Sequence, residues 1–186
     1  MFGKALIVDL GTGASNVKPL KESVLRSFIG GAGLGTWLMH ECCPAGLEAL
    51  APDAPLIFVF SPLVGTPLTT SAKFAVVAKS PLTGRLTDAL ASSHFAIAGK
   101  RTGYDAIVLR GRCSGPSVVM MTVARFRSPR PTISGVCRQP RLSANCASEW
   151  VRPGRVAAIG PAGERVVRFA TISHDGRHAG RGDSGR

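Results

Sequence analysis

A glycine-rich segment near the N-terminus contains the first residues that could bind a ligand. Residues Gly30–Gly35 have the sequence Gly-Gly-Ala-Gly-Leu-Gly and are expected to lie between two helices. Exposed amide N–H groups in such a segment, followed by the N-terminus of a helix, can hold a phosphate. The alternative is a tight turn without a ligand. A dinucleotide fold is not supported, because no strand leads into a G-x-G-x-x-G pattern and Pro44 and Pro52 interrupt the expected βαβ unit.

A second glycine-rich segment lies at the C-terminal end of the sequence. In Gly176–Arg186 four glycines are interleaved with positively charged residues, among them Arg177 and Arg181. Arginine on a flexible glycine backbone suits bidentate contacts to phosphate. The alternative is a solvated terminal tail, because chain ends are often poorly ordered.

The net charge of +12 over 186 residues raises the possibility of a nucleic-acid partner. The distribution of the charge argues against it. Between Val123 and Arg155 there are seven arginines and one acid, Glu149, so this stretch carries half of the net charge. Only Phe126 and Trp150 are aromatic there, and they form no pattern for stacking on bases. A basic nucleic-acid-binding protein remains the rival class of function.

The cysteines and the apolar runs limit the other classes of function. The five cysteines contain no C-x-x-C pair, which favours reduced thiols in the core over a metal site. No apolar run reaches the roughly 18 residues that a membrane span needs, and the sequence after Met1 has no signal-type stretch. We therefore expect a cytoplasmic protein without a membrane partner.

Apolar and alternating runs predict the elements that must position the two glycine segments. Strands are expected at Lys4–Leu10, Ser15–Pro19, Leu56–Phe60, Phe74–Ala78, Tyr104–Leu109, Val118–Val123, Val156–Ile159 and Val166–Ala170. Helices are expected at Leu20–Phe28, Leu34–Glu41 and Ser92–Lys100. Mixed strands, short helices and abundant glycine favour an α+β fold with a mixed β-sheet over a doubly wound fold.

One turn formula occurs twice. Ser61–Gly65 and Ser80–Gly84 both begin Ser-Pro-Leu and end in glycine, and each follows a predicted strand. The similarity raises the possibility of two related subdomains.

Five blocks of sequence, in this order, resemble the N-terminal domain of the aldehyde ferredoxin oxidoreductase family, the tungsten or molybdenum bis-pterin enzymes. The blocks are Ile29–Gly35, Ser71–Gly84, Gly103–Val108, Ile159–Glu164 and Ala179–Gly182. Because they are distributed over most of the chain, the resemblance is specific. It implies that residues 1–186 form a single pterin-binding domain that is incomplete at its C-terminus.

The resemblance also implies a reaction and its partners. Full-length members of the family oxidise aldehydes or related substrates at a tungsten or molybdenum bis-pterin centre, and electrons pass through a 4Fe-4S cluster to ferredoxin. The cluster ligands and the acid/base residues lie in later domains of the family, so no catalytic residue is expected in this chain. Ferredoxin is the expected partner of the full-length protein, and a homodimer is left open.

The resemblance implies that nine residues contact the cofactor. They are Gly31, Gly33, Lys73, Phe74, Asp88, Ser93, Gly180, Arg181 and Gly182. Glycine amides and the two cations would contact the pterins and their phosphates, with a magnesium ion between the phosphates.

Three positions depart from the family pattern. Lys73 stands where the family usually has arginine, which keeps the charge but loses the planar fork. Ala32 replaces an arginine of the first glycine loop, and Leu90 falls where many members have an asparagine near the magnesium. The magnesium loses an oxygen ligand at Leu90, and Asp88 and Ser93 are the candidates to replace it.

The stretch 123–152 shows none of the family features. We hypothesise that it is translated out of frame, because Thr132–Gly135 and Cys146–Trp150 both correspond to family-like sequence read one nucleotide late. On this hypothesis the chain ends early, is the product of a disrupted gene, and packs poorly between Ala124 and Arg152. The alternative is a genuinely divergent basic loop.

Overall fold

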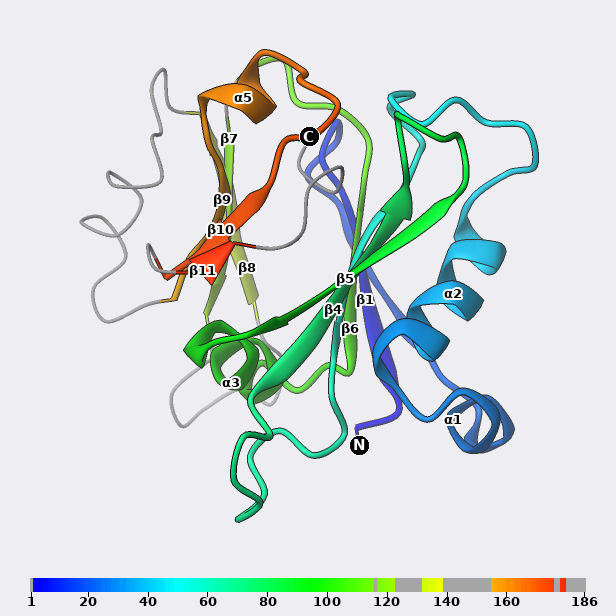
Figure 1. Cartoon of the computed structure of the whole chain (residues 1–186), viewed down its shortest axis with the longest axis vertical. Coiled ribbons are helices and arrows are strands. Elements are labelled where there is room, and N and C mark those ends of the chain that lie inside the picture. The colour runs from blue at the N-terminus through cyan, green and yellow to red at the C-terminus, as the bar shows by residue number, and fades with distance from the viewer. Residues whose placement is uncertain (1, 116, 123–131, 139–154, 176–177, 180–186) are drawn as a thin grey trace.

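A six-stranded mixed sheet organises the first 110 residues of the computed structural model, which describes residues 2–115, 117–122, 132–138, 155–175 and 178–179 (Figure 1). The strand order is β2-β1-β6-β3-β4-β5. The strands are β1 (Lys4–Asp9), β2 (Ser15–Pro19), β3 (Leu56–Phe60), β4 (Lys73–Lys79), β5 (Leu86–Ser92) and β6 (Ala106–Arg110). Only β1 and β6 pair in parallel, and the other neighbours are antiparallel. The α+β fold with a mixed sheet is therefore confirmed.

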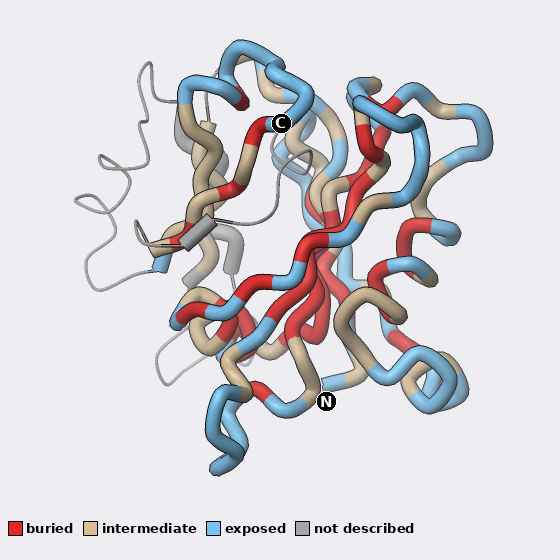
Figure 2. The backbone as a smooth tube through the Cα atoms, in the orientation of Figure 1, coloured by how far each residue is buried: buried red, intermediate tan, exposed pale blue. Residues whose placement is uncertain are grey.

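Two helices cover one face of this sheet. They are α1 (Glu22–Phe28) and α2 (Gly31–Cys42), and the sheet beneath α2 is buried (Figure 2). Leu34 and Leu38 of α2 are fully buried against the sheet. A Cβ atom added to Gly35 would overlap the side chain of Val77 in β4, so only glycine lets α2 approach this closely. The helix and the sheet therefore share one dry core.

The opposite face of the sheet packs against α3 and a second, three-stranded sheet (Figure 1). Besides β6, the elements after β5 are α3 (His94–Arg101), β7 (Ser117–Thr122), β8 (Thr132–Arg138), β9 (Ala157–Ile159), α5 (Pro161–Glu164), β10 (Ile172–His174) and β11 (His178–Ala179). The three-stranded sheet has the order β11-β10-β9, and β7 pairs with β8. Aromatic rings from β3, β4 and α3 fill this second core around Phe58, Phe74 and Phe95.

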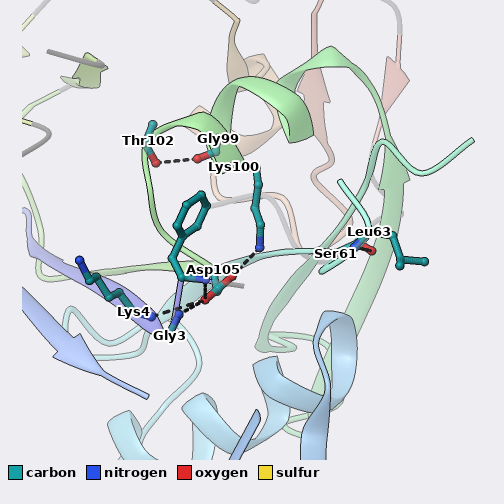
Figure 3. A network of polar contacts seen from close by, with 9 residues as sticks. Gly3, Lys4, Ser61, Leu63, Gly99, Lys100, Thr102 and Asp105 are labelled. Carbon is teal, nitrogen blue, oxygen red and sulfur yellow. Dashed lines mark hydrogen bonds and ion pairs between the residues drawn. The ribbon is translucent and has the colours of Figure 1, made fainter. Parts of the chain in front are cut away.

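A buried carboxylate joins the chain start to β6 (Figure 3). Asp105 is 1% exposed and forms an ion pair with Lys100 through Oδ1. Its Oδ2 atom accepts hydrogen bonds from the backbone N–H groups of Phe2 and Gly3 at 2.8 and 2.7 Å. The backbone N–H of Asp105 donates in turn to the carbonyl of Lys4. The motif Gly103–Val108 therefore has a structural role, which is to fix the start of β1 beside β6.

Most predicted elements are confirmed, including the helix predicted over Ser92–Lys100, which spans His94–Arg101. No element was predicted for the residues that form the edge strand β5, and one predicted strand is wrong. The predicted strand Val166–Ala170 is irregular, because α5 occupies the preceding residues and Val166 adopts a positive φ of 57°. The strand lies instead at β10. In the stretch 123–152, only Thr132–Arg138 is described, and it forms β8.

The two Ser-Pro-Leu turns share a local structure. The hydroxyl of Ser61 accepts a hydrogen bond from the N–H of Leu63, and the hydroxyl of Ser80 accepts one from the N–H of Leu82, each at 3.2 Å. The turns follow β3 and β4, which are antiparallel neighbours, so they lie at opposite ends of the same sheet. The formula therefore encodes a serine turn that is used twice within one sheet.

Candidate functional site

Lys73 and Ser92 face each other at one end of the sheet. Lys73 is the first residue of β4, Ser92 is the last residue of β5, and the two are directly paired in the strand register. The ammonium Nζ of Lys73 donates a hydrogen bond to the hydroxyl of Ser92 at 2.9 Å, and both side chains are exposed. This end of the sheet therefore carries an exposed cation and an exposed hydroxyl side by side.

The backbone around this pair is held on both sides. The carbonyl of Lys73 accepts a hydrogen bond from Ser61 N–H at 3.1 Å, and Ser93 N–H donates to the carbonyl of Ala72 at 3.1 Å. The strand ends at Lys73 and Ser92 are thus tied to both the loop after β3 and the start of α3. Side chains on such anchored strand ends are well placed for binding.

The N-terminus of α2 lies at the same end of the same sheet face as Lys73. A Cβ atom at Gly30 would lie 2.7 Å from Cδ of Pro62, which directly follows the Ser61 that bonds to Lys73. Side chains two and four residues apart in a strand share a face, so Lys73 is on the face of Val77, which α2 covers. The first glycine segment and Lys73 are therefore brought together.

The structure places Gly31 and Gly33 in the first turn of α2, where sequence analysis expected a loop between helices. Gly31 has a positive φ of 56°, and a Cβ atom at Gly33 would lie 2.8 Å from the carbonyl oxygen of Phe28. These contacts let α2 begin immediately after α1. The first N–H groups of an α-helix have no acceptor within the helix, so the amides of Gly31, Ala32 and Gly33 can serve a ligand.

Asp88 and Leu90 lie on the same sheet face as Lys73 and Ser92. Leu90 pairs with Ala75 and is 67% exposed, and Asp88 pairs with Val77 and is also exposed. These side chains of β5 are open to solvent, although α2 contacts the strand. The exposed face of β5 thus presents a carboxylate, an apolar side chain and a hydroxyl in a row.

Phe74 and Ser93 are directed elsewhere. Phe74 is 1% exposed and belongs to the core on the opposite face, with its ring 5.2 Å from that of His174. Ser93 is buried and caps α3, because its hydroxyl accepts a hydrogen bond from the N–H of Phe95 at 3.1 Å. The structure therefore does not bring Phe74 and Lys73 to a common surface.

The chain leading to the second glycine segment passes close to this end of the sheet. Asp175 Oδ2 accepts a hydrogen bond from the N–H of Phe95 at 3.0 Å, so it caps α3 together with Ser93. The strand β11 contacts β5 and ends at Ala179. Gly180, Arg181 and Gly182 lie outside the described residues.

The roles of two residues in this region were not predicted from the sequence. Ser92 could have been found from the period of two in Leu86–Ser92, which places Asp88, Leu90 and Ser92 on one face. Asp175 had no local signal, because its partner Phe95 is 80 residues away.

The cysteines and other titratable groups add little to this region. Cys42, Cys43 and Cys113 are free thiols of intermediate burial, and burial raises the pKa of the Cys42 thiol. Cys146 lies outside the described residues, and β8 contains Cys137.

Among the described residues, no three His, Cys, Asp or Glu side chains gather where they could hold a metal ion. No helix in the described ranges is long and apolar enough to cross a membrane.

Comparisons with known proteins identify relatives along the whole chain. The chain is 33% identical over 186 residues to the tungsten-containing aldehyde ferredoxin oxidoreductase of Pyrococcus furiosus, and 32% identical over 189 residues to that of Thermococcus kodakarensis. Each alignment covers 99% of this chain and 31% of the relative. The aliphatic sulfonate oxidoreductase WOR-like subunit of Pyrococcus furiosus is 32% identical over 194 residues and 95% of this chain. The chain thus spans about a third of the length of these curated relatives.

A solved structure and a family model agree with these relatives. The active-site complex BamBC of benzoyl coenzyme A reductase, solved with 1,5-dienoyl-CoA, matches with a TM-score of 0.84 and 26% identity over 99% of this chain and 28% of that one. The family model for the aldehyde ferredoxin oxidoreductase N-terminal domain matches residues 5–186. With its mixed sheet and its family motifs in matching order, the chain belongs to the aldehyde ferredoxin oxidoreductase family.

Proposed function

We propose that this chain is the cofactor-binding N-terminal domain of an oxidoreductase that oxidises aldehydes or related substrates at a tungsten or molybdenum bis-pterin centre. The bound metal–pterin group would supply the redox chemistry. This domain would hold the phosphate end of a pterin, ferredoxin would accept the electrons, and a 4Fe-4S cluster would be held by regions that the longer relatives have and this chain does not span.

One observation carries this proposal. The ammonium group of Lys73 and the first-turn amides of α2 lie at the same end of the same sheet face. Both are donors, and both favour negative charge, the first by its full charge and the second by the helix dipole. An anionic group such as a pterin phosphate fits this donor set. The tungsten-containing relatives support tungsten as the metal.

The donor set fits a magnesium ion less well than it fits a phosphate. Magnesium requires oxygen ligands in a near-octahedral arrangement. Leu90 supplies none, and the hydroxyl of Ser93 already caps α3. Asp88 remains as an exposed carboxylate on the same face of β5. A magnesium ion between the phosphates would therefore depend on Asp88 and on water.

Copurification of the cofactor tests the proposal. The full chain is expressed in a host that makes metal–pterin cofactors, in medium supplemented with tungstate, and is analysed for tungsten, molybdenum and oxidised pterin fluorescence. We expect pterin to copurify with the chain. The Lys73→Ala variant should lose most of it, whereas Lys21→Ala, which removes an exposed lysine at the start of α1, should retain it. A folded chain that carries no pterin would contradict the proposal.

The hypothesis of a disrupted reading frame across 123–152 has a separate test. Resequencing of the locus should show a single-nucleotide change that restores family-like sequence at Thr132–Gly135 and Cys146–Trp150. An uninterrupted frame in independent reads would exclude it and leave a divergent basic segment.

A further inference from the structure

The contact between Lys73 and Ser92 has a chemical consequence for anion binding. The ammonium group has three N–H donors, and one of them is used by the hydroxyl of Ser92. That hydroxyl accepts from Lys73 and still carries its own O–H donor. In the described part of the chain, neither side chain makes another hydrogen bond. The pair therefore presents ammonium N–H groups and one hydroxyl O–H, from two adjacent points, to the same region.

Two adjacent donors of this kind resemble the donor geometry of an arginine. A guanidinium group contacts two oxygens of one phosphate through a rigid planar fork, whereas an ammonium group is a point charge on a flexible stem. Lys73 alone can supply the charge but not the second fixed donor. Ser92 lies directly opposite it in the register of β4 and β5, on the same sheet face, and is anchored by the strand backbone.

We propose that Ser92 is an anion-binding residue that, together with Lys73, forms a two-point contact to a phosphate group. Lys73 provides the charge, and Ser92 both holds the ammonium group in place and donates its O–H to a second phosphate oxygen. This inference rests on the proposed function, because it assumes that Lys73 faces the phosphate of the bound cofactor.

The contact with Ser92 would also lower the cost of ordering the Lys73 side chain when a ligand binds. A free lysine loses on the order of 1.5–2 kcal/mol of rotamer freedom when it is fixed by a ligand. Because Ser92 already holds the ammonium group, part of that freedom is lost before the ligand arrives. Preordering of this kind strengthens binding without any new contact.

A double-mutant cycle with inorganic pyrophosphate as the probe tests this pair. Binding to the full chain is measured by isothermal titration calorimetry for the wild type, Ser92→Ala, Lys73→Arg and the double variant. We expect Ser92→Ala to weaken binding about tenfold, as for the loss of a hydrogen bond to a charged group. With Lys73→Arg present, the further change Ser92→Ala should weaken binding less than about threefold, because the guanidinium brings its own fork.

Control variants separate this role from a merely structural one. Ser92→Thr keeps the hydroxyl and should retain the wild-type affinity. Ser15→Ala, which removes an exposed serine on β2 at the other edge of the sheet, should also retain the wild-type affinity. An equal loss from Ser92→Ala with and without Lys73→Arg would overturn the two-point contact. If Lys73→Ala weakens binding but Ser92→Ala does not, only this inference fails. If neither variant weakens binding, or the wild type does not bind pyrophosphate, the proposed function fails as well.

Discussion

Lys100 of α3 and Asp105, the residue immediately before β6, form an ion pair that is almost completely shielded from water, with side chains 9% and 1% exposed. The carboxylate of Asp105 also accepts hydrogen bonds from the backbone N–H groups of Phe2 and Gly3 (Figure 3). A buried ion pair is costly to break from one side, because the remaining charge has no partner.

Asp105→Asn should therefore lower the free energy of unfolding by about 3–5 kcal/mol. Urea denaturation followed by circular dichroism measures the effect. Asp53→Asn, which removes an exposed carboxylate, should change stability by less than about 0.5 kcal/mol. A similar small change for both variants would show that the pair contributes nothing to the fold.

Gly35→Ala should destabilise the domain by about 1–3 kcal/mol, because the added methyl group overlaps Val77 beneath α2. Thermal unfolding measures the loss, and Val77→Ala in the same chain should recover part of it by making room. The matched control is Gly115→Ala, where the added methyl group meets no atom within 4 Å. Equal stability of the two glycine variants would contradict the close contact of α2 with the sheet.

Leu90→Asn should make anion binding depend on magnesium. The substitution places an amide oxygen on the exposed face of β5, two residues from Asp88 and two from Ser92. We expect magnesium to strengthen pyrophosphate binding several-fold more in this variant than in the wild type, about 1 kcal/mol. Calorimetric titrations with magnesium and with EDTA give the comparison. Leu86→Asn, at the other end of the same strand, is the control.

Cys42 should make the stability of the domain fall at alkaline pH. Burial raises the pKa of its thiol, so the folded protein keeps this proton to a higher pH than the unfolded chain does. The stabilisation is fully present below the unfolded pKa of about 8.5 and is lost as pH rises through the folded value.

The measurement is the free energy of unfolding of the wild type and of Cys42→Ala at neutral and alkaline pH. The wild type should lose more stability than the variant over this interval. Tyr104, whose pKa is also raised by burial, acts in the same direction in both proteins and cancels in the comparison. Parallel pH profiles would show that Cys42 does not titrate differently in the two states.

The fold was largely predictable where apolar runs are continuous. Leu56–Phe60 is buried on both faces and was identified from its composition. The strand β5 was missed because its inward residues, Ala89 and Ala91, are small and give a weak alternation signal. The strand predicted at Val166–Ala170 is wrong because β-propensity favours valine in a strand, whereas Val166 adopts a positive φ next to α5.

The site was predictable only in part. The sequence motif indicated both Lys73 and Phe74, but neighbouring residues of a strand face opposite sides, and Phe74 belongs to the core. The contact between Lys73 and Ser92 depends on the register of β4 and β5, which a single sequence does not specify when one of the strands is not recognised.

The parallel pairing of β1 with β6 has a consequence for biosynthesis. Ala5 lies beside Ala106, so the second neighbour of β1 leaves the ribosome about a hundred residues after the first strand does. The hairpin of β1 and β2 can form early. The backbone N–H groups of Phe2 and Gly3, however, cannot donate to the carboxylate of Asp105 until that residue has been synthesised. During that interval one edge of the hairpin is open to chaperones or to other nascent chains. Completion of the sheet therefore has to wait until β6 has been synthesised.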